Sequence, residues 1–127
     1  MAVAGSIAFT YTSPRDSAPV QLVIFDWTSS AGGAVSEVFS DFLYGIVNRA
    51  VFVPDGGGTQ PTNLYDVLLK DDHGFDVLEG LAANRSNVNT EEVTPTSLRR
   101  VIASRLELAI TNAGAAKGGL VYLYLAK

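Results

Sequence analysis

The chain has 127 residues and a formal net charge of −4, with 47% hydrophobic and 17% charged residues, a composition typical of one folded domain. The nine Lys and Arg are scattered and no apolar run is long enough to cross a bilayer, so we expect neither nucleic acid nor membrane as a partner. The start of the chain lacks the charged and apolar regions of a signal peptide, and the absence of cysteine excludes disulfides and thiolate zinc sites.

The first half of the chain begins with two predicted strands. Residues 7–12 alternate between large apolar and small or polar side chains, which predicts a β-strand. Residues 20–27 are apolar on both parities, as is typical of a central strand that is covered on two sides. Residues 28–33 are predicted to form the turn that follows.

A third and a fourth strand are predicted on either side of Gly45. Residues 35–42 form the third, with Glu37 and Asp41 exposed, and residues 46–53 form the fourth. Gly45 interrupts the pattern and predicts a bulge or a sharp bend.

The middle of the chain combines loops with one more strand. Residues 54–61 contain three glycines and two prolines, so they must form a surface loop. Residues 65–70 alternate and predict a strand, which a turn at residues 71–74 closes. Residues 76–81 could form a single helical turn capped by Asp76.

The last third of the chain is predicted to start as a long ordered polar loop, residues 84–95, and to end as a hairpin. Residues 102–111 alternate, which favours a strand, although apolar residues every fourth position from Leu98 to Ile110 also fit a helix. A turn-rich link at residues 112–119 leads to a second apolar run at residues 120–125. The sequence therefore predicts a C-terminal β-hairpin.

These elements predict an all-β fold. We expect a single-domain antiparallel β-sandwich or barrel of about seven or eight short strands, because turns are frequent and helix signals few. Residues 1–127 form that one domain, and residues 1–6 could form a flexible N-terminal arm.

No group of residues predicts a catalytic, cofactor-binding or metal site. His73, the only histidine, lies among Asp71, Asp72 and Asp76, a composition that favours a solvated turn over a metal site. The spacing of an EF-hand calcium loop fails, since Asp66 as the first position puts Asp71 where glycine is required. We therefore expect a protein that is not an enzyme and holds no cofactor.

Three other features have a functional and a structural interpretation. The glycines at 56–58 lack the Lys-Ser/Thr ending of a phosphate-binding loop and favour a flexible loop. Trp27 could form a sugar-binding platform with the tyrosines, but large aromatic side chains usually fill cores. Arg99 and Arg100 could meet an acidic partner surface, but their position favours a solvated strand end.

Eight segments carry a resemblance to a known group. They are FDWTS at 25–29, GG at 32–33, VPD at 53–55, PTNLYDV at 61–67, DDHGFDVLEG at 71–80, LAANR at 81–85, LEL at 106–108 and NAG at 112–114. With them the chain resembles small virion structural proteins of tailed bacteriophages, a head-associated group that includes decoration and cement proteins. The resemblance implies an assembly role in a virion built in the host cytoplasm.

The resemblance implies partners rather than substrates. The first hypothesis is a decoration or cement protein that binds the major capsid protein and stabilises the head, as a trimer or ring. A neck or tail subunit, such as a head-to-tail connector, that binds other virion proteins is the alternative, and a carbohydrate- or receptor-binding module is a third.

Partner contacts are expected in three segments. The N-terminal segment, residues 1–7, is uncharged and could add a strand to a partner sheet. The two polar loops at residues 54–61 and 84–95 are expected at the surface, where binding residues concentrate. The candidate contact residues in these segments are Ala2, Val3, Ile7, Gly56, Gly57, Gly58, Arg85, Glu91 and Glu92.

Overall fold

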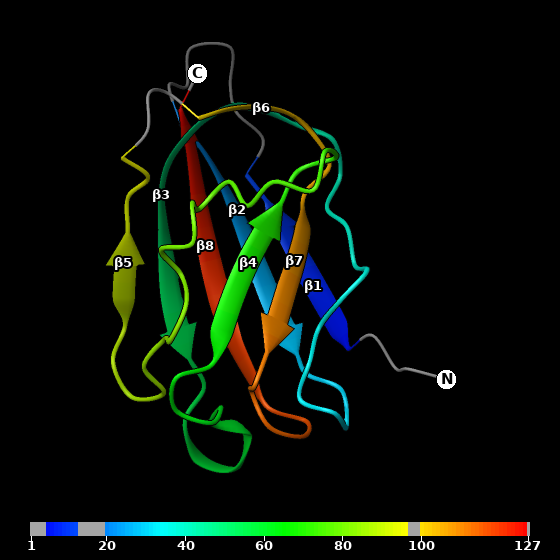
Figure 1. The fold of residues 1–127 in the computed structure, drawn as a ribbon, viewed down its shortest axis with the longest axis vertical. Helices are drawn as coiled ribbons and strands as arrows, with labels where there is room; N and C mark the ends of the chain where they lie inside the picture. Colours follow the sequence, from blue (N-terminus) through cyan, green and yellow to red (C-terminus); the bar gives the residue numbers. More distant parts are fainter. Residues whose placement is uncertain (1–4, 13–19, 97–99, 127) are drawn as a thin grey trace.

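The computed structural model describes residues 5–12, 20–96 and 100–126, and these residues form a two-layered β-sandwich (Figure 1). Within these described ranges, eight strands run antiparallel to their neighbours, and the only helical element is a short 3-10 turn, η1 (Gly57–Thr59). The all-β prediction is confirmed.

The larger layer is a six-stranded sheet in which the last strand of the chain lies at the centre. Its β1–β2–β8–β3 order places β8 between β2 and β3, and β5 and β6 both pair with β3. The bounds are β1 (Ser6–Tyr11), β2 (Val20–Thr28), β8 (Gly118–Ala126), β3 (Leu43–Pro54), β5 (Glu91–Val93) and β6 (Val101–Ser104).

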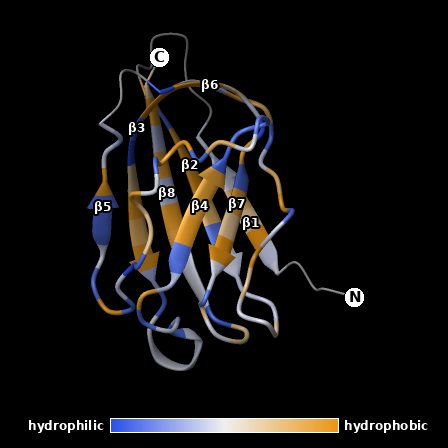
Figure 2. Cartoon of the chain, viewed as in Figure 1, coloured by the Kyte–Doolittle hydropathy of each residue, from blue (hydrophilic) through white to orange (hydrophobic). Residues whose placement is uncertain are grey.

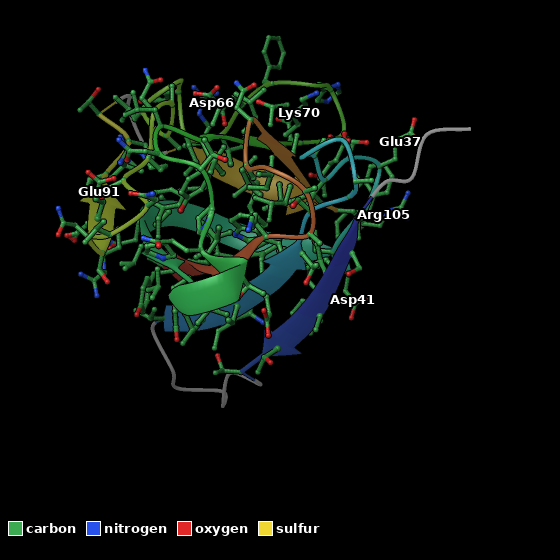
Figure 3. All side chains as sticks on the ribbon, turned by 90° about the horizontal axis from the view of Figure 1, so that it is seen from below. Glu37, Asp41, Asp66, Lys70, Glu91 and Arg105 are labelled. Atoms are coloured by element: carbon green, nitrogen blue, oxygen red, sulfur yellow. The ribbon has the colours of Figure 1, made fainter. Side chains whose placement is uncertain are left out.

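The smaller layer is a two-stranded sheet, β4 (Asp66–Lys70) and β7 (Glu107–Thr111), which lies in front of the six-stranded sheet in Figure 1. Figure 3 looks at the molecule from below and shows the two layers stacked. The core fills the space between them, because alternate side chains of each strand point inward.

Inward-pointing side chains are almost completely buried. Val23, Phe25 and Trp27 of β2 are at most 1% exposed, and Leu108 and Ile110 of β7 are fully buried. The predicted alternation at residues 102–110 is thus confirmed, and the helical alternative for this segment does not form.

The predicted strand at residues 102–111 is divided between the two layers. β6 pairs with β3, whereas β7 pairs with β4, and the hydrogen bonding changes partner at Arg105 and Leu106. Leu106 is tied to Ser40, whose hydroxyl accepts its main-chain N–H at 3.0 Å. The turn between β7 and β8 also connects the two layers, because β7 pairs with β4 in the smaller sheet and β8 pairs with β2 and β3 in the larger one.

The prediction of a strand at residues 35–42 is wrong. Only isolated bridges form, between Val35 and Ile110 and between Phe39 and Glu107. Glu37 has a φ of 57°, which an extended strand cannot contain, and its N–H donates to the Glu107 carboxylate at 2.8 Å. Glu37 itself is exposed, as the sequence predicts.

β3 passes through Gly45 without a break, so the irregularity lies elsewhere. The register of β3 against β8 shifts between Val47 and Arg49, which places the bulge three residues later than predicted. Gly45 has a φ of 143°, and a Cβ there would lie 2.7 Å from the main-chain oxygen of Ala126. Glycine is therefore required at this position for close strand packing.

Residues 76–81 form two successive turns rather than a helical turn. The N–H of Glu79 donates to Asp76 O and that of Leu81 to Leu78 O, while Glu79 has a φ of 60°, which ends any helix. The loop predicted at residues 84–95 also differs from the structure, because β5 lies within it.

Tyr65 gives a testable alkaline dependence of stability. Its ring is fully buried beside Trp27, at 5.5 Å between centroids, and burial raises the pKa of the hydroxyl to about 12. The unfolded chain releases this proton near its ordinary pKa of about 10. We therefore expect Tyr65 to leave the free energy of unfolding unchanged below about pH 10 and to lower it between about pH 10 and 12. Urea titrations at a series of pH values would measure this slope.

The control variant is Tyr65→Phe. The hydroxyl has no hydrogen-bond partner among the described residues, so the variant should be about as stable as the wild type at neutral pH. Its alkaline slope should be smaller, and an unchanged slope would contradict the assignment to Tyr65.

Candidate interaction surface

The side of the six-stranded sheet that faces away from β4 and β7 is largely apolar. We call it the outer face and define it by the outward-pointing side chains of β2, β3, β6 and β8. Its apolar members are Val20, Leu22, Ile24, Tyr44, Ile46, Val51, Val53, Val101, Ala103, Leu120, Tyr122, Tyr124 and Ala126.

Burial distinguishes the two sides of the same strands. Along β8, Val121, Leu123 and Leu125 are at most 1% exposed, whereas the outward Tyr122 and Tyr124 remain partly exposed. Tyr44 and Val101, at 66% and 65%, are among the most exposed large apolar residues described. Among the described residues, therefore, no second layer covers the outer face.

The strand registers place these side chains side by side. Ile24 of β2 lies opposite Tyr122 of β8, and Tyr122 lies opposite Val51 of β3. The neighbouring row joins Leu22, Tyr124 and Arg49 in the same way. The apolar side chains consequently form one continuous surface, and Figure 2 shows orange along much of β8.

Charge on the outer face is confined to a few positions near its sides. The Arg49 guanidinium lies 4.5 Å from the centre of the Tyr124 ring and 2.9 Å from a Glu92 carboxylate oxygen. Hydrogen bonds with Glu92 and Tyr124 raise the pKa of Arg49, so it stays charged. With Asp26 exposed on β2, Arg49 and Glu92 form a polar border on two sides of the apolar centre.

The charged residues predicted to contact a partner have partners within the chain. Arg85 and Glu91 form an ion pair at 3.7 Å, and Arg85 also donates to Ala83 O. Glu91 accepts the N–H of Ser86 at 2.7 Å, and Glu92 binds Arg49. These side chains hold loop and strand together, so intersubunit ion pairs would have to replace bonds already made.

The two predicted contact loops meet at one end of the sandwich. The Gln60 amide donates to Asn87 O at 2.8 Å, and Lys117 Nζ donates to Gly58 O at 3.0 Å. Gly56, Gly57 and Gly58 are exposed there, and a Cβ at each of them would meet no atom within 4 Å.

Two residues of the predicted N-terminal contact segment belong to the sheet. Ser6 and Ile7 belong to β1, where Ile7 lies opposite Trp27 and packs partly buried against the core. Ala2 and Val3 lie outside the described residues.

The remaining candidates are structural. His73 is in an exposed turn, in which the Asp71 carboxylate accepts the N–H groups of His73 and Phe75. Trp27 is 1% exposed, so the sugar-platform interpretation is wrong for it. Arg100 forms an ion pair with Glu79 at 3.1 Å, and Arg99 lies outside the described residues. No three His, Asp or Glu side chains of the described residues are grouped as metal ligands.

The outer face was missed from the sequence, although a signal for it was present. Residues 20–27 and 120–125 are apolar on both parities, and a strand covered on two sides explains that pattern equally well. Which side is covered depends on the placement of β4 and β7, and the pattern within one strand does not contain that information.

By structure, the chain is an all-β domain that leaves one apolar sheet face uncovered among its described residues. No family model, curated protein or solved structure matches the chain. The described residues contain no helix that is long and apolar enough to cross a membrane.

Proposed function

We propose that this protein is a non-enzymatic virion structural subunit of a tailed bacteriophage, a decoration protein that binds the major capsid protein through its outer face. The resemblance over eight segments supports the phage assignment. The apolar outer face is the observation that carries the binding role, because a soluble monomer rarely leaves so much continuous apolar surface uncovered.

The size of the outer face supports this role. β2, β3, β6 and β8 have 34 residues in total. At about 4.8 Å between strands and about 3.3 Å per residue, they cover roughly 540 Å² in plan. A standard protein interface buries about 800 Å² per partner. The outer face with its polar border therefore approaches the area that one specific partner requires.

The proposed mechanism is thermodynamic linkage. A protein that binds the assembled shell and not its free subunits stabilises the shell by its binding free energy. Each copy bridges adjacent capsid subunits, and the stabilisation of the shell is the sum over all copies. A modest binding free energy per copy is therefore sufficient. Heads without the protein should assemble but lose DNA more readily on heating.

The variant Tyr122→Glu tests the outer face. Tyr122 lies between Ile24 and Val51 at the centre of the face, so a carboxylate there would be desolvated on docking. We expect occupancy on purified heads to need about tenfold more protein or worse, a loss of at least about 1.4 kcal/mol. The measurement is a binding titration of the purified protein on heads that lack it.

Leu68→Glu is the matched control. Leu68 is 39% exposed on β4, on the opposite side of the molecule, and its change should leave occupancy intact. Equal loss in both variants, or full binding by Tyr122→Glu, would contradict docking through the outer face. Binding to necks or tails instead of heads would overturn the decoration assignment.

A further inference from the structure

The edges of the two sheets differ sharply in how they are protected. β4 is covered along its free edge by residues 76–85, with Val67 N donating to Ala82 O and Arg85 N donating to Tyr65 O. The free edge of β7 is covered by the segment around Val35, which exchanges two main-chain hydrogen bonds with Ile110 at 2.9 Å. Both edges of the smaller sheet are therefore occupied.

The edge of the larger sheet at β3 is also protected. β6 pairs with one part of β3 and β5 with another, and β5 has only three residues, two of them Glu91 and Glu92. Short strands and charged side chains are common devices against edge-to-edge pairing. In Figure 2, β5 is blue.

β1 has none of these protections. Its six residues, Ser6–Tyr11, contain no charge, proline or glycine. Its main chain makes no hydrogen bond to the described residues other than those to β2. Among the described parts of the two sheets, β1 is the one long, uncharged and open edge.

The register identifies which main-chain groups are open. Thr12 N donates to Leu22 O, and Thr12 and Leu22 continue the β1–β2 pairing, so even-numbered residues of β1 face β2. Ser29 N donates to Lys117 O on the other side of β2, which fits the same alternation. The N–H and C=O groups of Ile7, Phe9 and Tyr11 consequently point away from the sheet.

We propose that β1 pairs with β1 of a second copy of this chain, antiparallel and around a two-fold axis at Phe9. This register puts Phe9 opposite Phe9 and Ile7 opposite Tyr11 of the other copy. The open N–H and C=O groups of all three residues are then bonded, and two six-stranded sheets become one continuous sheet.

The side chains favour a second copy as the occupant. On the outer side of β1, Ala8 would lie opposite Thr10 of the other copy, and both are small and uncharged. On the inner side, Phe9 stacks on Tyr11 at 5.8 Å and meets Phe25 edge-on at 5.3 Å, while remaining partly exposed. A second Phe9 would extend this aromatic row across the axis.

Charges beside this edge are mixed in sign. Figure 3 shows Glu37, Asp41 and Arg105 on the side of the molecule where β1 lies. Asp41 is linked to β1 directly, because its N–H donates to the Tyr11 hydroxyl at 2.8 Å. These exposed groups would form the rim of the dimer and leave its uncharged centre to the strands.

Sedimentation velocity over about 1 to 100 μM chain tests the proposal, since a weak dimer dissociates in this range. We expect a species of twice the 13.4 kDa chain mass to increase with concentration. Amide exchange at Ile7, Phe9 and Tyr11 should slow over the same range. A monomer at every concentration would overturn the proposal.

Two double variants test the register. Ala8→Lys with Thr10→Lys places like charges opposite each other at both Ala8–Thr10 contacts, and we expect at least about tenfold weaker dimerisation. Ala8→Lys with Thr10→Glu places opposite charges there and should restore the dimer. Both positions are exposed, so thermal unfolding should confirm that both variants fold.

Equal dimerisation by the two double variants would overturn the β1 pairing and direct attention to the outer face. The proposal does not depend on a virion role, because it concerns only copies of this chain in solution. The two proposals can fail separately. Absence of the dimer would contradict the β1 pairing alone, and full binding of Tyr122→Glu to heads would contradict docking through the outer face alone.

Discussion

Leu108→Ala is expected to lower the free energy of unfolding by about 2–5 kcal/mol. Leu108 is fully buried in β7, opposite Leu69 of β4, and both side chains point into the space between the layers. Alanine would remove apolar contacts and leave a cavity that the strands on both sides cannot close. Urea denaturation of the two purified proteins measures the difference.

Arg105→Ala is the control, because it lies three residues earlier on the opposite parity. Arg105 is exposed, and its guanidinium lies 4.9 Å from the centre of the Phe39 ring. Loss of that contact should cost about 1 kcal/mol or less. Similar losses in the two variants would contradict the alternation that defines this part of the fold.

Asp76→Ala is expected to cost about 3 kcal/mol. One carboxylate oxygen accepts the N–H groups of Leu69 and Leu78 at 3.0 Å each, and the other accepts that of Gly80 at 2.7 Å. Asp76 thus holds the two turns after β4 against the end of that strand. Alanine leaves these three donors without their acceptor in a partly buried position.

Asp72→Ala provides the comparison, since its side chain is 60% exposed in the preceding turn. We expect a change within about 0.5 kcal/mol, as for most surface substitutions. If thermal unfolding shows Asp76→Ala to be as stable as Asp72→Ala, the carboxylate does not organise these turns.

Local patterns in the sequence predict a large part of the fold. The alternation of residues 7–12 and 65–70 corresponds to β1 and β4, and the turn at residues 71–74 forms where aspartate and glycine favour it. Asp76 accepts main-chain N–H groups as its position after the turn indicates. These features depend on neighbours within a few residues.

The differences arise where tertiary contacts override local pattern. The left-handed conformation of Glu37 interrupts an apparently regular strand, and its N–H is satisfied by Glu107, a residue distant in the sequence. The alternation at residues 102–111 continues unbroken while the strand changes sheets at Arg105. The sequence does not predict β5, because two of its three residues are glutamates and glutamate is uncommon in strands.

The candidate site was the least predictable part. Arg85, Glu91 and Glu92 are charged loop and strand-edge residues of the kind that often contact partners, yet the fold pairs them with one another and with Arg49. Tyr122 lies on the outer face, but it stands in an apolar run, so the sequence alone does not distinguish it from a core residue.

The most direct test of the proposed function is the position and copy number of this chain in an intact particle, determined by electron cryomicroscopy. We expect copies in the hundreds, spread over the head with the outer face against the major capsid protein, since a symmetric shell repeats each docking site. A ring of about six or twelve copies at the neck, or absence of the chain from the particle, would contradict the account.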